Sequence, residues 1–150
     1  MESLPGFRRQ NAFRGMSAYA EGWGLYAEQL AFELGWYRDD KVSDLGRLNA
    51  ELFRVRRLVT DTGLHACKWT REQAIAYGIP QSEVHRYVVM PGQACSYKIG
   101  MLKILDLRAK AKQKLDAKFS LPAFHDVVLR NGAVPPIQLE KIVREWIGAA

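Results

Sequence analysis

Residues 16–35 read MSAYAEGWGLYAEQLAFELG, and this stretch indicates how the chain folds. It contains three glutamates and neither lysine nor arginine. At about 100° per residue, its aromatic and aliphatic side chains fill one helical face and extend onto the others. Gly35 ends the pattern, as glycine often does just beyond a helix. The stretch therefore predicts a helix over 17–34 that is apolar nearly all round, a pattern typical of a buried helix.

Helical spacing continues from this stretch to the end of the chain. It predicts further helices over 42–62, 71–77, 82–89, 93–114, 121–129 and 136–148, and an irregular lead-in over 1–15. A leucine and valine stripe runs along the helix 42–62, and we expect it to face a core. Its members are Leu45, Leu48, Leu52, Val55 and Val59. Since no strand-like alternation appears, we predict an all-α fold forming a single helical domain over 1–150.

The composition excludes several classes of protein. The 150 residues are 48% apolar and 25% charged, which is typical of one globular domain and not of a disordered chain. No apolar run approaches the roughly 18 residues of a membrane span. The two cysteines are too few for a disulfide scaffold and lack zinc-ribbon spacing. The first residues also lack the pattern of a signal peptide, so we expect a cytoplasmic location by default.

Most of the formal net charge of +6 comes from residues 98–118. Seven lysines and arginines lie there beside two aspartates. Such a segment can bind phosphate groups, but no aromatic side chains lie between the lysines to stack on bases. We therefore expect a solvated helix face, and a basic nucleic-acid binder is the weaker alternative.

Glu21 and Glu28 are chemically unusual for so apolar a helix. They are seven residues apart, or two helical turns, so they lie along one line. A buried carboxylate needs a cation, a hydrogen-bond donor or a metal as its partner. Because their own helix carries no cation, two alternatives stay open: ion pairs with arginines such as Arg54, Arg57 or Arg86, or a metal ion.

Gly22 and Gly24 flank Trp23 in the same helix. Each glycine lowers helix stability by roughly 1 kcal/mol relative to alanine. Their presence indicates that another backbone or a ligand approaches closely.

Arg57, Asp61 and His65 form a second polar line with spacings of four and four. If the helix continues through Gly63, all three share one face, and Asp61 could orient the imidazole of His65. The alternative is a salt-bridged helix end with a surface histidine.

Tyr97 offers a phenol that could donate a hydrogen bond to a developing oxyanion. The alternative is a half-buried tyrosine with a packing role. His85 and His125 have no comparable neighbours in the sequence, and we interpret both as structural.

Four strings of the sequence resemble the C-terminal part of the bacterial "domain of unknown function 885" family. They are YAEGWGLYAE (19–28), RLVTDTGLHA (57–66), WTREQA (69–74) and PGQACSYKIG (91–100), and the resemblance extends through 119–129. That family is similar to zinc metallopeptidases of the gluzincin type, such as thimet oligopeptidase and the Taq-type carboxypeptidases. The resemblance implies a helical fragment of a larger, mostly helical catalytic domain, with zinc as cofactor and a peptide as substrate.

The resemblance also implies roles for individual residues. In the family an HExxPGHH string precedes EGWxLYAE; the two histidines of HExxH bind zinc, and its glutamate is the general base. Glu21 would then be the third zinc ligand, with Glu28 as a supporting acidic residue near the metal. Asp61 and Arg57 would support the site. His65 and Tyr97 would line its substrate-facing wall.

The chain departs from this pattern because its three histidines, at 65, 85 and 125, do not form an HExxH motif. We therefore expect the C-terminal portion of a peptidase-like zinc hydrolase that is not catalytic by itself. The alternative is a non-catalytic helical interaction module. A chain cut from a larger helical domain should expose an apolar patch, so we also predict self-association.

Overall fold

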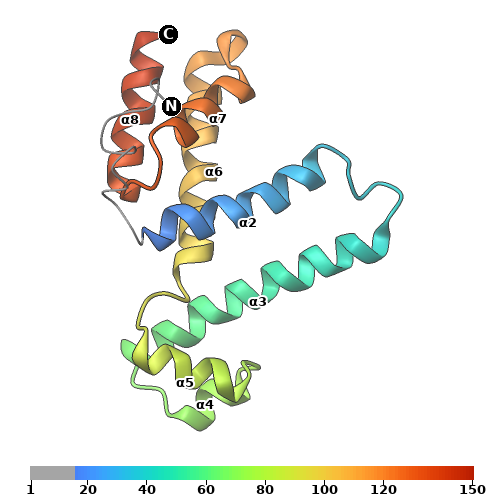
Figure 1. Cartoon of the computed structure of the whole chain (residues 1–150), viewed down its shortest axis with the longest axis vertical. Helices are drawn as coiled ribbons and strands as arrows, with labels where there is room; N and C mark the ends of the chain where they lie inside the picture. Colours follow the sequence, from blue (N-terminus) through green and yellow to red (C-terminus); the bar gives the residue numbers. More distant parts are fainter. Residues whose placement is uncertain (1–15) are drawn as a thin grey trace.

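The computed structural model describes residues 16–150, and within them every regular element is a helix (Figure 1). In chain order they are α2 (Ser17–Glu33), α3 (Lys41–His65), α4 (Arg71–Ala76), α5 (Gln81–Val89), α6 (Ser96–Leu115), the 3₁₀ helix η1 (Asp116–Lys118), α7 (Leu121–Arg130) and α8 (Pro136–Ala149). The all-α prediction is confirmed. The predicted irregular lead-in over 1–15 lies outside the described residues, and the single-domain assignment stays a prediction.

Short-range signals set where several helices begin. The Thr70 side chain accepts a hydrogen bond from the Gln73 backbone, and the Gln73 side chain accepts one from the Thr70 backbone, which forms a capping box before α4. The predicted helix start at residue 93 is wrong, since α6 begins at Ser96. The reason is a series of turns before it, in which Gly92 has a φ of +80°.

Helices α2 and α6 cross with their backbones in contact. A Cβ atom on Gly22 would lie 2.5 Å from the Gly100 Cα, and one on Gly100 would lie 1.9 Å from the carbonyl oxygen of Ala18. No L-residue with a side chain fits these spaces, so both positions require glycine. The prediction that Gly22 marks the approach of another backbone is confirmed. Gly24 is different, because an added Cβ there meets no described atom within 4 Å.

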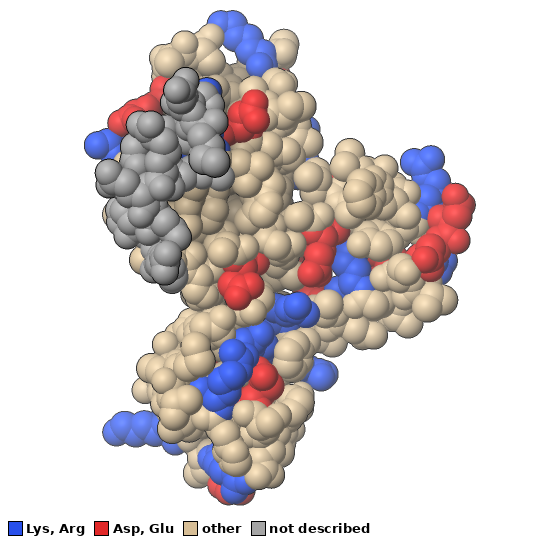
Figure 2. Space-filling view, in the orientation of Figure 1, with Lys and Arg blue, Asp and Glu red and all other residues tan. Residues whose placement is uncertain are grey.

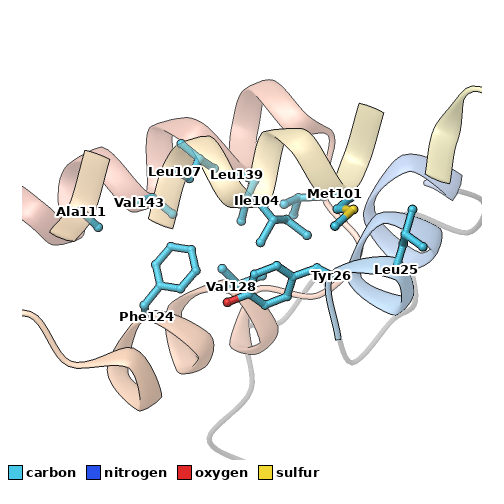
Figure 3. Packing of buried hydrophobic residues seen from close by; sticks show 11 residues of the cluster. Leu25, Tyr26, Met101, Ile104, Leu107, Ala111, Phe124, Val128, Leu139 and Val143 are labelled. Carbon is cyan, nitrogen blue, oxygen red and sulfur yellow. The ribbon is translucent and has the colours of Figure 1, made fainter. Parts of the chain in front are cut away.

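The main hydrophobic core surrounds this crossing and joins α2, α6, α7 and α8 (Figure 3). Its buried members are Leu25, Tyr26, Met101, Ile104, Leu107, Ala111, Phe124, Val128, Val134, Leu139 and Val143. A second, smaller cluster contains Ala74, Ile79, Val84, Tyr87 and Ala94, with Phe53 and Leu64 of α3 packed against it. Helix α3 is therefore anchored at its C-terminal half by the second cluster.

Helix α3 has its charged face turned inward. It runs back beside α2 in the opposite direction (Figure 1). The side chain of Arg47 is buried, and its guanidinium lies 4.6 Å from the centre of the Phe32 ring on α2. Arg47 also pairs with Asp44 at 2.8 Å and with Glu51 at 3.5 Å. These contacts compensate the burial of the guanidinium, which would otherwise be costly.

The apolar stripe of α3 is turned outward over its N-terminal half. Leu45 is 58% exposed, and Leu48 and Leu52 are each 48% exposed. The prediction that this stripe faces a core is wrong for these three residues, and Val55 and Val59 are half-buried. The expectation that the first helix is buried holds only in part, because Leu25 and Tyr26 are buried whereas Phe32, near the end of α2, is exposed. Beyond the crossing, α2 and α3 project from the rest of the described chain and have few neighbours to cover them (Figure 1).

No helix within residues 16–150 combines the length and the apolar character needed to cross a membrane.

His125 of α7 packs against Trp23 and Tyr26 of α2, as a structural residue does. Its Nε2 is hydrogen-bonded to the Tyr26 hydroxyl at 2.8 Å, and the Trp23 ring meets it edge-on with centroids 5.5 Å apart. Burial lowers the pKa of His125 below its ordinary value of 6.5, and the positive charge of Arg108 lowers it further.

We predict that Gly22→Ala and Gly100→Ala each lower the free energy of unfolding by about 1–3 kcal/mol, because the added methyl group forces the two helices apart. Gly24→Ala is the matched control in the same helix. Its methyl group is unopposed, so the substitution should raise the free energy of unfolding by about 0.5–1 kcal/mol. Urea denaturation followed by circular dichroism measures all three. Similar effects at positions 22 and 24 would contradict the tight crossing.

We also predict that part of the loss of stability in mild acid comes from His125. Its pKa is lower in the folded state, so the unfolded chain takes up the proton first. The stabilising contribution is therefore complete above the unfolded pKa and is lost as the pH falls through the folded pKa. His125→Gln should flatten the dependence of unfolding free energy on pH below about 6.5. His85→Gln is the matched control for replacing a histidine at an exposed position. An unchanged slope in His125→Gln would contradict the prediction.

Candidate functional site

Helix α2 presents Glu21 and Glu28 two turns apart, and both side chains are half-buried. Among the described residues neither carboxylate makes an ion pair. The Oε2 atom of Glu28 is buried and has no hydrogen-bond partner there. A buried carboxylate oxygen without a partner is costly, so Glu28 is a candidate for a contact with a group outside the described residues.

The predicted ion pairs of these glutamates with Arg54, Arg57 or Arg86 are not formed in the part of the chain that the structure describes. Arg57 and Arg86 instead pair with Glu83, at 3.7 Å and 2.6 Å. Arg54 donates from Nη1 to the carbonyl of Ala50 at 3.0 Å, and its Nε is buried without a hydrogen-bond partner. These arginines therefore have their contacts on α3 and α5, and the alternative that they pair with Glu21 or Glu28 is wrong for the described residues.

A network of charge-assisted hydrogen bonds joins α3, α5 and the turns before α6. The Gln93 side-chain oxygen accepts from Arg57 Nη2 at 3.1 Å and from Arg86 Nη1 at 3.2 Å. The hydrogen bonds from Arg86 hold the pKa of the Glu83 carboxyl below its usual range, and the charges of Arg86 and Arg57 act in the same direction. The network holds the guanidinium of Arg57 in place although the side chain is only 5% exposed.

Tyr97 lies in the first turn of α6 against two guanidinium groups. The Cζ of Arg57 is 4.6 Å from the ring centre, and that of Arg54 is 5.6 Å away. Both distances are in the range of cation–π attraction. The half-buried ring thus has the packing contacts of the alternative interpretation, and its substrate-facing role stays a prediction.

Asp61 holds the turn that leads into α6. It is 3% exposed, and its two carboxylate oxygens accept the backbone N–H of Gly92 at 3.0 and 3.2 Å. The thiol of Cys95 lies 3.7 Å from the same carboxylate. Burial raises the pKa of that thiol, and the charge of Asp61 raises it further. Asp61 is therefore a structural acceptor for the turn.

His65 lies apart from Asp61 although both belong to α3. The helix does continue through Gly63. A glycine is needed at this position because the Trp69 indole would lie 2.4 Å from an added Cβ. His65 ends the helix in an exposed position, and its Nε2 is 3.0 Å from the Tyr87 carbonyl oxygen. The prediction that Asp61 orients His65 is wrong, because its carboxylate binds Gly92 instead. The surface-histidine alternative describes this geometry.

Sequence reasoning missed the two residues that organise the network, Glu83 and Gln93. Glu83 precedes Arg86 by three residues on one helix, a spacing that places the two side chains side by side. Gln93 belongs to the string PGQACSYKIG, which was recognised only as a family feature. Its pairing with Arg57 connects residues 36 apart, and local spacing carries no signal for such a contact.

Acidic side chains of other segments neutralise much of the basic segment 98–118. Lys98 pairs with Glu51, Lys103 with Glu140, and Arg108 with Glu33. Positive and negative groups are interspersed on the face shown in Figure 2. These pairs favour the predicted solvated and paired face over a phosphate-binding patch.

The described residues do not form a complete zinc site. A catalytic zinc ion takes three protein ligands and keeps a fourth position open. Within residues 16–150, no three histidine, cysteine, aspartate or glutamate side chains lie close enough to hold a metal. Glu21 and Glu28 each offer carboxylate oxygens to a metal ion. Any further ligands must come from outside the described residues.

A family model and a solved structure each match most of this chain. A family model described as "Bacterial protein of unknown function (DUF885)" matches residues 1–143. A solved structure of the "putative lipoprotein from Colwellia psychrerythraea" is 56% identical, with a TM-score of 0.84 over 89% of this chain. The match covers 24% of that protein, so the chain spans about a quarter of its length. None of the curated proteins compared with the chain matches it. The chain therefore belongs to the DUF885 family of bacterial proteins of unknown function.

Proposed function

We propose that this chain is the C-terminal portion of a zinc-dependent, peptidase-like hydrolase. In this proposal it contributes the zinc ligand Glu21 and part of the substrate wall, and it is not catalytic by itself. The observation that carries the proposal is the pair of carboxylates on α2 that have no ion-pair partner among the described residues, one with a buried unpaired oxygen. The coverage of only 24% of the solved relative supports it, because a longer protein has room for the missing ligands.

Each residue then has a defined task. Glu21 would hold the metal, and the buried Oε2 of Glu28 would accept a hydrogen bond from a ligand side chain and so orient it. When bound, zinc would lower the pKa of a water molecule and polarise the peptide carbonyl group. Tyr97 would donate its phenolic hydrogen to the developing oxyanion, with its ring held by Arg57 and Arg54.

Three further residues have less direct roles in the proposal. Arg57 and Asp61 would support the site by fixing Gln93 and Gly92 in the turns before α6. His65, exposed at the end of α3, would contact the bound peptide at the edge of the wall. The name of the solved relative also suggests a lipoprotein, and we propose a location outside the cytoplasm in place of the default expected from the sequence.

We predict that the isolated chain binds no stoichiometric zinc at micromolar concentrations and hydrolyses no peptide, because its described residues lack three ligands. Equilibrium dialysis with metal analysis measures the binding. Tight binding of one zinc ion per chain would contradict the incomplete site.

A chimera tests the role of Glu21. The matching segment of the Colwellia protein is replaced by this chain, which the 56% identity makes feasible. We predict that Glu21→Gln lowers the zinc affinity of the chimera and its peptide hydrolysis by roughly 100-fold or more, and that Glu28→Gln lowers zinc affinity by roughly 10- to 100-fold. Glu145→Gln is the matched control, since that side chain is exposed on α8.

The chimera separates the outcomes clearly. A chimera that is folded but binds no zinc overturns the metalloenzyme proposal. A chimera that keeps its zinc after Glu21→Gln removes Glu21 from the ligand set. Equal losses in Glu21→Gln and Glu145→Gln would indicate a general loss of structure.

A further inference from the structure

Arg54 on α3 carries a charge that has no anionic partner within the described residues. Its side chain is half-buried, and it forms no ion pair with any residue of the range 16–150. Every other lysine or arginine that is buried or half-buried in that range forms one. These residues are Arg47, Arg57, Arg86, Lys98, Lys103 and Arg108. Taking a guanidinium group partly out of water without an anion is costly, so Arg54 is a candidate for binding one.

The surroundings of Arg54 hold its guanidinium group in place and leave part of it free. Its Nη1 atom donates a hydrogen bond to the carbonyl oxygen of Ala50, one turn earlier on α3, at 3.0 Å. Its Cζ atom lies 5.6 Å from the ring centre of Tyr97 on α6. The Nε atom is buried without a hydrogen-bond partner, and Nη2, which is not fully buried, makes no hydrogen bond to a described residue. The fold therefore positions the group and keeps Nη2 available to an anion.

Arg57 is the closest comparison, because it contacts the same ring with its Cζ 4.6 Å from the ring centre of Tyr97. Its charge is met inside the described chain. Glu83 pairs with it at 3.7 Å, and the Gln93 side-chain oxygen accepts a hydrogen bond from its Nη2 at 3.1 Å. An arginine that only packs against Tyr97 thus finds its acceptors in the same fold. Arg54 has no such acceptors there, and this difference favours a partner that binds and leaves over a permanent one.

The half-buried charges without an ion pair coincide with the residues of the proposed hydrolytic site. Within residues 16–150, the half-buried acidic and basic side chains that form no ion pair are Glu21, Glu28 and Arg54. The proposed function gives the two glutamates to the metal centre. It gives Tyr97, which Arg54 contacts, to the oxyanion. In that function, an anion that reaches Arg54 lies beside the peptide group that reacts.

We propose that Arg54 binds a carboxylate group of the peptide substrate, an inference that rests on the proposed hydrolase function. A guanidinium group binds a carboxylate through charge-assisted hydrogen bonds, which are stronger than those between neutral groups. The carboxylate belongs either to the C-terminus of the peptide or to an acidic side chain, since both present the same chemistry to Arg54. In both cases the site prefers a peptide with a negative charge near the bond that is cleaved.

The test measures peptide binding to the chimera with the Colwellia protein. Fluorescent peptides of alanine and glycine are compared in pairs: a free C-terminus against a C-terminal amide, and a glutamate against a glutamine within an amidated peptide. Stopped-flow anisotropy gives the dissociation constant before turnover, so the result does not require hydrolysis. We expect a carboxylate to tighten binding by roughly 10- to 100-fold over its neutral counterpart. The pair that shows the difference identifies the carboxylate.

Arg54→Gln should abolish this preference and leave the affinity for the neutral peptides unchanged. Arg56→Gln is the matched control and should keep the preference, because Arg56 is an exposed arginine of the same helix. A preference that is absent from the unsubstituted chimera, that survives Arg54→Gln, or that is lost equally in Arg56→Gln would overturn the proposal. A lack of zinc or of hydrolysis would count against the hydrolase function, whereas the role of Arg54 is measured by binding alone.

A stability measurement separates a substrate carboxylate from an acidic side chain elsewhere in a longer protein. The effect of Arg54→Gln on the urea midpoint is measured in the 150-residue chain and in the chimera. We expect the same shift in both, because in this proposal the rest of the protein does not pair with Arg54. A larger shift in the chimera would mean that a permanent acidic partner is left unpaired, and it would overturn the proposal.

Discussion

The contact between the backbones of Gly22 and Gly100 is the constraint on which the remaining structure depends. It lets α2 lie directly on α6, and the main core then closes around the crossing with α7 and α8. Glu21 is adjacent to this contact in the chain, so its backbone position is held by a close crossing of two helices. Carboxylates placed on such a rigid element are held with little freedom, which is the arrangement that a ligand or metal contact requires.

Helix α3 separates two kinds of chemistry on its two sides. Its inner side carries the buried side chains of Arg47, Arg57 and Asp61, and each of them has a partner on another turn or element. Its outer side carries leucines that meet solvent. A helix that buries charged side chains depends on their partners, because a buried charge without one is costly.

The candidate site was predictable in its residue types and only partly in its geometry. The carboxylate pair on α2 follows from a string that the sequence displays, whereas the position of Tyr97 next to Arg57 and Arg54 is a long-range contact that it does not display. The partners of Asp61 and Arg57 do not follow from it either, because Gly92 and Gln93 lie 31 and 36 residues away and approach through the turns before α6. Of the two interpretations of His65, the one in which Asp61 orients it is wrong for the same reason, since the Asp61 carboxylate is bound to Gly92.

By itself the sequence determined the helices, their caps and breaks, the glycine at the crossing and the line of two glutamates. These features depend on backbone propensity, side-chain periodicity and local hydrogen bonds, which act over a few residues. Only the tertiary structure decided which face of each helix is buried. Periodicity predicted a buried leucine stripe on α3, but burial depends on which neighbours are present. In the described chain α2 and α6 offer Phe32 and Lys98 to the charged side, and no described element covers the leucines.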